Sequence, residues 1–228
     1  MKHILLFIAI SFGTGLFAQK DEVFAKLTEY GFATDALDHG MKDADATHAF
    51  KLKTTTVTDD KTEVEECHFD PTQPVGSKWI LDTHDGHAPS KKQKKQFHKA
   101  HNTEDQNVNG KVDDNSWKIV SDDAEHFVVS FKYDKASLPK KFDFLGDCTG
   151  TAYFKKQTKT LEKATFVNDG PLHIKFFNVT KMNMVVNYKQ FDGNFVMDTE
   201  TLNMTVMLLG SAVLIKEQME YSDYKKIK

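Results

Sequence analysis

The sequence predicts a mainly β fold of the α+β class: a strongly curved antiparallel sheet, or half-barrel, wrapped around an N-terminal helix, with one short helical excursion. From residue 116 onward, short segments of alternating apolar and polar residues follow one another at spacings of about ten residues, separated by Gly, Asn, Asp or Pro. Such spacings leave no room for crossover helices, so the sheet must be mainly antiparallel. The only long amphipathic segment precedes these strands, which makes it the cover for their apolar face.

Residues 1–18 have the layout of a secretory signal peptide. A short basic start is followed by an apolar run from Ile4 to Phe12 and by small or permissive residues before Ala18. The run is too short to span a bilayer. We expect cleavage near Ala18–Gln19, which leaves residues 19–228 as a single domain that is periplasmic or secreted, without a stable membrane anchor.

The first element of the domain is a helix over about 21–41. Its apolar residues fall at helical spacing, and Gly31 offers a break that would divide it into two short helices. The residues at this spacing are Val23, Phe24, Leu27 and Tyr30. After Phe50 the pattern changes to a period of two, and the stretch to Asp70 predicts a β-hairpin around the turn "TDDKT".

The stretch "WILDTHDGHAPSKKQKKQFHKAHN", residues 79–102, predicts a short strand followed by a helix over about 89–101. Pro89 stands where a first helical turn begins, and Phe97 is the only large apolar residue of the helix. The lysines either dock an anionic surface such as lipid headgroups or form a solvated face, with Phe97 fixing the helix to the sheet. They are Lys91, Lys92, Lys94, Lys95 and Lys99.

The same stretch contains two His-x-x-His pairs, which predict a metal site if the loop folds back on the helix. His98 and His101 are three residues apart and share a helix face, as a metal pair requires. The alternative is that the histidines lie on the surface and hold zinc weakly or not at all. The candidate ligands are His84, His87, His98 and His101.

The strands after residue 171 predict a dry face that either packs around the helix or lines a hydrophobic cavity. Apolar residues alternate with Asn, Lys, His or Thr for most of each strand, so they point to one side of the sheet. Methionine is common among them, and its flexible, polarizable side chain suits both an irregular core and a surface that accepts varied apolar ligands. The candidate ligand-binding residues are Met182, Met184, Val186, Met204, Val206, Leu208, Phe176 and Ile174.

Composition and missing motifs argue against nucleic-acid binding and against catalysis. All 30 basic residues are lysine, and the net charge is -3. The chain therefore has no arginine, whose guanidinium group forms paired hydrogen bonds with phosphates and base edges, so no nucleic-acid partner is expected. The chain has no Gly-x-Ser-x-Gly elbow, His-Glu-x-x-His helix or phosphate loop, so we predict no enzyme and no cofactor. Cys67 and Cys148 form either one disulfide or two buried thiols.

A signal peptide, a leading helix, a run of antiparallel strands and a helix-bearing excursion after a tryptophan strand resemble the LolA/LolB-like superfamily of periplasmic lipoprotein carriers. "FDGNFVMDT", residues 191–199, is similar to the Asp-Gly and aromatic strand of these carriers, and residues 79–102 resemble a segment of a family of secreted bacterial proteins. The resemblance implies a half-barrel with a lipid-like cavity. We therefore expect a non-enzymatic binding or carrier protein for a lipid, acyl chain or lipoprotein; the alternative is an envelope structural or interaction protein that has no cavity and contacts a protein partner.

Overall fold

The computed structural model describes residues 18–32, 48–59, 61–101, 110–174 and 177–227. The predicted signal peptide, apart from Ala18, and the second half of the predicted first helix lie outside these residues. Within the described residues no helix is both long and apolar enough to cross a membrane.

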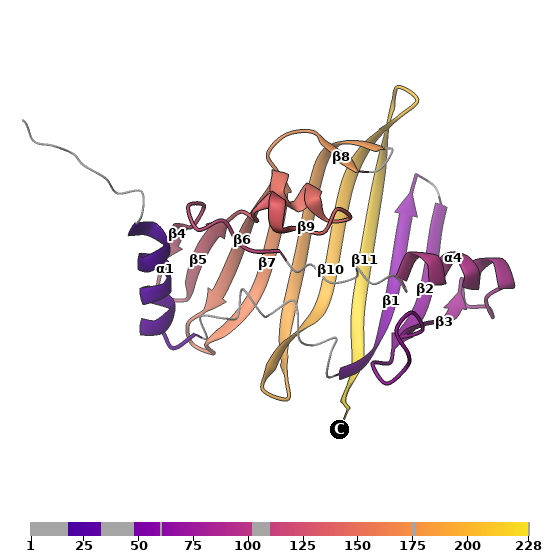
Figure 1. Ribbon diagram of the computed structural model, residues 1–228, viewed down its shortest axis with the longest axis horizontal. Helices are drawn as coiled ribbons and strands as arrows, with labels where there is room; N and C mark the ends of the chain where they lie inside the picture. Colours follow the sequence, from indigo (N-terminus) through magenta and orange to yellow (C-terminus); the bar gives the residue numbers. More distant parts are fainter. Residues whose placement is uncertain (1–17, 33–47, 60, 102–109, 175–176, 228) are drawn as a thin grey trace, which may run out of the picture.

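One open antiparallel sheet forms the body of the protein, which confirms the predicted fold class (Figure 1). Its strand order is β3-β2-β1-β11-β10-β9-β7-β6-β5-β4, with β8 paired to β9 beside this path. The strands are β1 (His48–Thr58), β2 (Lys61–Phe69), β3 (Trp79–His84), β4 (Lys118–Asp122), β5 (His126–Phe131), β6 (Cys148–Lys155), β7 (Thr160–Asn168), β8 (Leu172–Ile174), β9 (Phe177–Phe191), β10 (Asn194–Leu208) and β11 (Ser211–Lys226). Because β11 pairs with β1, the strands nearest the two ends of the chain meet in the middle of the sheet.

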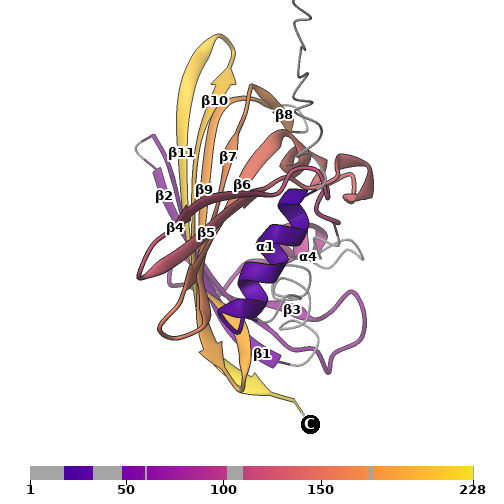
Figure 2. The ribbon, with the colours of Figure 1, turned by 90° about the vertical axis from the view of Figure 1, so that its left-hand side faces the viewer.

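The two α-helices of the described residues lie on the same side of the curved sheet (Figure 2), toward its opposite ends (Figure 1). Helix α1 (Ala18–Glu29) lies at the β4 end, and α4 (Lys91–His101) lies over β3 and its neighbours. Two 3-10 helices, η1 (Lys135–Ser137) and η2 (Asp143–Asp147), connect β5 to β6. We call the side that carries these helices the concave face.

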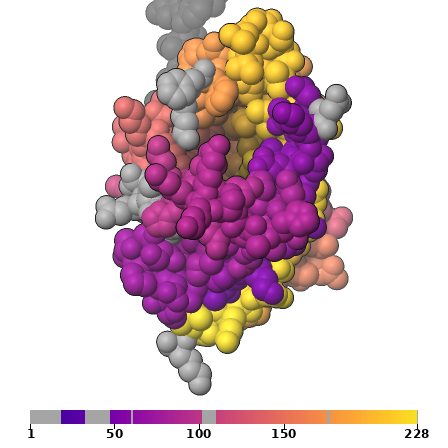
Figure 3. Space-filling model, turned by 90° about the vertical axis from the view of Figure 1, so that its right-hand side faces the viewer, coloured from indigo at the N-terminus to yellow at the C-terminus, as the bar shows by residue number. Residues whose placement is uncertain are grey.

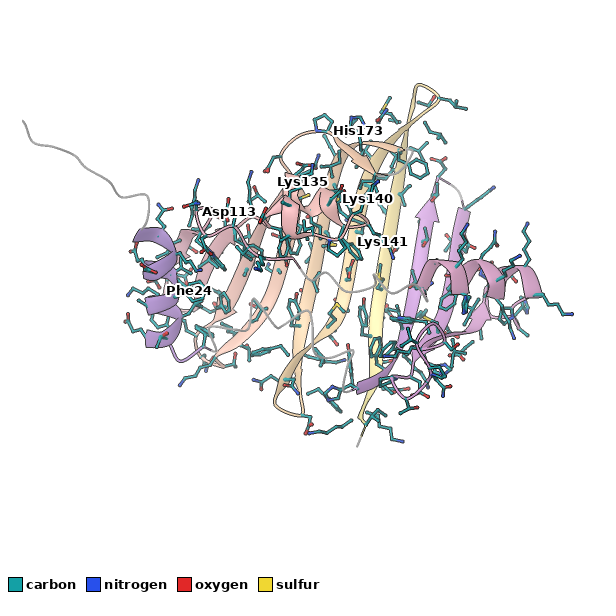
Figure 4. The ribbon with its side chains drawn as sticks, viewed as in Figure 1. Phe24, Asp113, Lys135, Lys140, Lys141 and His173 are labelled. Carbon is teal, nitrogen blue, oxygen red and sulfur yellow. The ribbon has the colours of Figure 1, made fainter. Side chains whose placement is uncertain are left out.

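The first core lies under α1 and spans the strands from β4 to β9. Val23 and Leu27 of α1 are fully buried. Phe24 packs edge-on against Trp117, with ring centroids 5.3 Å apart, at the β4 end of the sheet (Figure 4). The helical spacing read from the sequence therefore marks the face that α1 buries, although α1 covers only one end of the sheet.

A separate second core lies between α4 and strands β1–β3. Phe97 is the buried residue of α4 and fixes this lysine-rich helix to the sheet. The buried members are Phe50, Leu52, Cys67, Phe69, Leu81, Phe97 and Tyr221. The apolar side chains thus form two clusters at the two ends of one sheet rather than one continuous core.

The two cysteines belong to different cores and are free thiols. Cys67 lies in the second core and Cys148 in the first. Burial raises the pKa of each thiol to about 12, so neither is ionised at neutral pH. Of the two alternatives open from the sequence, the structure shows buried thiols.

Strand β10 differs from the sequence pattern, in which the alternating segments 193–199 and 202–210 suggest two strands separated by Glu200 and Thr201. The structure has one continuous strand whose register with β9 shifts between Met197 and Thr199. A β-bulge inserts one residue without ending the pairing, so the polar stretch is accommodated inside the strand. The result is a long, uninterrupted floor at the centre of the sheet.

Candidate functional site

The concave face of the central strands β9, β10 and β11 is apolar but incompletely covered. Leu202 of β10 stands between Met184 of β9 and Glu217 of β11 in the strand register, and Met204 stands between Met182 and Ile215. Leu202, Met204, Met184 and Ile215 pack against the first core yet remain partly exposed. We call this strip, with Met219, Glu200 and Glu217, the central groove.

The groove exists because, among the described residues, the two cores do not meet over the central strands. Strands in the middle of a large sheet are ordinarily the most deeply covered part of a core. Here most residues of β10 between its ends are half-buried, and β11 alternates between half-buried and exposed positions. The space-filling view shows the molecule hollowed above α4, with the yellow of β11 at the floor (Figure 3).

Two carboxylates lie within this apolar strip. Glu200 pairs in register with Met219, and Glu217 with Leu202, so both side chains point to the concave face from neighbouring strands. Burial, with a smaller contribution from the charge of Glu217, raises the pKa of Glu200 to about 7. Burial also raises the pKa of Glu217, a hydrogen bond from Thr56 opposes this, and the charge of Glu65 adds to it.

Sequence reasoning missed these two glutamates, although the signal was present. In "TETLNMTV" the period of two puts Glu200 on the same side as Leu202 and Met204. In "VLIKEQMEY" it puts Glu217 on the side of Ile215 and Met219. A charged residue at an apolar position of a strand is costly to bury, which makes it a candidate for function.

The residues predicted to bind an apolar ligand separate into several groups. Met182, Val186 and Val206 are only 2%, 3% and 2% exposed and belong to or border the first core. Met184 and Met204 are half-buried and line the groove. Phe176 lies outside the described residues, and Ile174 of β8 is half-buried against the first core.

The remaining predicted residue, Leu208, lies at the exposed end of the β10–β11 hairpin. Leu209 is fully exposed in the turn, and Leu214 is exposed on the returning strand. Leu209 has a φ of 49° and Gly210 a φ of 86°, so both turn residues have left-handed backbone conformations. This hairpin extends beyond the neighbouring strands in Figure 1.

The four candidate metal ligands are not brought together as a set. His84 Nε2 lies 3.1 Å from Glu63 Oε1, and His84 Nδ1 lies 3.3 Å from Glu65 Oε1. Among the described residues, Glu63, Glu65 and His84 are the group whose ligand atoms lie close enough for one ion. This group is at the β2–β3 end of the concave face.

The other three histidines have different surroundings. His87 and His98 are exposed. The ring of His101 stacks on Phe97, with centroids 4.0 Å apart, and its Nδ1 donates to the Phe97 carbonyl oxygen at 3.1 Å. Burial lowers the pKa of His101, and the charge of Lys141 acts in the same direction, whereas the Phe97 carbonyl and Glu65 oppose this.

The five lysines of α4 are all exposed. None of them forms an ion pair with a carboxylate of the described part of the chain. Their side chains therefore give α4 an exposed, positively charged outer face, which both alternatives require, while Phe97 fixes its inner face.

Comparison with known proteins gives only remote structural similarity. No family model and no curated protein matches the chain. The chain is similar to a DUF1329 family protein from Desulfovibrio piger, with 8% identity, a TM-score of 0.40, and coverage of 93% of this chain and 94% of that one.

Two further solved structures are similar at the same level. A LolA superfamily protein from Nitrosomonas europaea has 13% identity and a TM-score of 0.35, with 92% of this chain and 94% of that one covered. An outer membrane lipoprotein-sorting protein domain from Vibrio parahaemolyticus has 10% identity and a TM-score of 0.41, with 91% and 93% covered.

Proposed function

We propose that the protein is a non-enzymatic binding or carrier protein that holds the apolar chain of a lipid in the central groove. The observation that carries this proposal is the partial exposure of Met184, Leu202, Met204 and Ile215 on the floor of the sheet, between two separate cores. The signal-peptide pattern of residues 1–18 supports a periplasmic or secreted location for this binding.

The physical reason is the cost of leaving such a strip in contact with water. Transfer of each methylene group from water to an apolar surface contributes about 0.8 kcal/mol, so an acyl chain laid along the groove gains from every carbon it buries. Flexible methionine side chains on the floor adapt to chains of different shape. A pocket of this kind needs few polar groups, and those it has determine which ligand is accepted.

The proposal is tested by adding an environment-sensitive apolar fluorophore to the mature protein and displacing it with dodecanol. We expect saturable binding and displacement. If the fluorophore does not bind, or if dodecanol does not displace it, the groove does not take apolar chains. The function would then be that of an envelope structural or interaction protein, whose surface contacts a protein partner.

A further inference from the structure

We propose that the lipid held in the central groove carries an amine headgroup, which Glu200 and Glu217 bind. This inference rests on the proposed function, because the headgroup is placed by the apolar chain beside it. It goes further by naming the class of lipid, an aminolipid, rather than a fatty acid or a neutral lipid.

The positions of the two glutamates are suited to one cation. They stand on adjacent strands, offset diagonally by the pairing of Leu202 with Glu217 and of Glu200 with Met219. Diagonal neighbours on one face of an antiparallel pair are within reach of each other's long side chains. An ammonium group between them can donate a hydrogen bond to each carboxylate while its chain contacts Leu202 and Met204.

The charges around the pair favour a positively charged ligand. Neither glutamate is within ion-pair distance of a lysine or histidine among the described residues. The charge that acts on Glu200 comes from Glu217, and the charge that acts on Glu217 comes from Glu65, so both are negative. A bound ammonium would relieve this repulsion and compensate the burial of the carboxylates.

The same charges exclude the most common alternative ligand. A fatty acid would bring its carboxylate to two partly buried carboxylates, where like charges repel strongly because little water screens them. A long-chain alcohol would gain only the apolar contacts and one hydrogen bond. The order of affinity expected from the groove is therefore amine, then alcohol, then carboxylate.

The experiment compares dodecylamine, dodecanol and dodecanoate as displacers of the apolar fluorophore at pH 7.5. We expect dodecylamine to bind about tenfold more tightly than dodecanol, as one charge-assisted contact implies. In Glu200→Gln and Glu217→Gln the ratio of these two affinities should fall toward one. Dodecanol, measured on each variant, corrects for any change in the apolar floor.

Glu220→Gln is the matched control. Glu220 lies on β11 like Glu217 but on the opposite, convex face, so the ratio should stay at its wild-type value. Equal affinities for dodecylamine and dodecanol in the wild type would overturn the inference and leave the proposed function standing. An amine preference that persists when Glu200→Gln and Glu217→Gln are combined would do the same. If none of the three displaces the fluorophore, the proposed function itself fails.

Discussion

Glu200 on β10 and Glu217 on β11 point to the same face of adjacent strands. Burial raises the pKa of Glu200, and the negative charge of Glu217 raises it further. Two carboxylates in an apolar strip destabilise the fold that holds them, since each must lose water and no lysine or histidine of the described residues pairs with it. Such an arrangement makes sense at a position that a ligand completes.

The first prediction is that Glu200→Gln stabilises the protein in a pH-dependent way. The pKa of Glu200 rises from 4.5 to about 7 on folding, so between these values the folded state holds a proton that the unfolded state has released. The free energy of unfolding of the wild type must then fall as pH rises through this window. Relative to the wild type, Glu200→Gln should gain about 2 to 3 kcal/mol between pH 4.5 and pH 8.

Urea denaturation at pH 4.5, 6 and 8 measures this gain, with Glu220→Gln as the exposed control on the neighbouring strand. A constant difference between Glu200→Gln and the wild type at all three values would show that Glu200 titrates normally. The prediction concerns the protein without ligand, because a bound amine would hold Glu200 ionised.

The second prediction compares two neighbouring residues of β9 that point to opposite faces. Met184 lines the groove, whereas Val185 points to the convex face. Met184→Glu should weaken binding of the apolar fluorophore at least tenfold, because a third carboxylate on the floor is costly to bury beside Glu200 and Glu217. Val185→Glu should leave it unchanged. Equal loss in both variants, measured by fluorescence titration, would place the fluorophore somewhere other than the groove.

The third prediction is that zinc binds at His84, with Glu63 and Glu65, rather than at the four histidines that the sequence suggested. Its side chain is 14% exposed and lies between Glu63 and Glu65, while His98 is exposed on α4. A carboxylate on one imidazole nitrogen commonly orients the other toward a metal. We expect zinc at about 100 times its dissociation constant to raise the melting temperature by about 5 °C.

His84→Ala should abolish this rise and His98→Ala should retain it. The measurement is thermal unfolding followed by circular dichroism, with and without zinc. If zinc leaves the melting temperature of the wild type unchanged, His84 is held by its two carboxylates alone and the metal hypothesis is wrong.

The fourth prediction is that Phe97 is the main contact between α4 and the sheet, although the ring of His101 also lies 5.8 Å from that of Trp79. It is 6% exposed, and the other side chains of α4 are half-buried or exposed. Phe97→Ala should cost about 3 kcal/mol of unfolding free energy, because it leaves a cavity in the second core. Lys99→Ala, two residues along the same helix, should change it by less than about 0.5 kcal/mol. Equal effects in urea denaturation would mean that the lysines carry the docking of α4.

The sequence was sufficient to predict the class of the fold but not the depth of its residues. A period of two tells which face of a strand a side chain occupies, so Met182, Met184 and Met204 were correctly grouped on one face. It does not tell how much lies above that face. Met182 is therefore buried core while Met184 and Met204 line a groove, and no feature of the strands themselves distinguishes them.

Long-range pairing explains what else the sequence could not predict. Glu65 meets His84 because β2 and β3 pair in that register, with a shift between Glu66 and Cys67. The pairing of the first strand, β1, with the last, β11, is also a matter of topology rather than of local pattern. The helical spacing of Val23 and Leu27 predicted that a helix would be buried, but not that it would cover only one end of the sheet.

The division into two cores makes the two tryptophans independent reporters. Trp117 is buried under α1 in the first core, whereas Trp79 packs beside Phe50 and Phe69 at the second. The chain contains no other tryptophan. Replacing either one with phenylalanine leaves a single tryptophan whose fluorescence follows the unfolding of one end of the sheet. If the two variants unfold at the same denaturant concentration, the two ends unfold cooperatively across the central strands; if they do not, each core unfolds by itself.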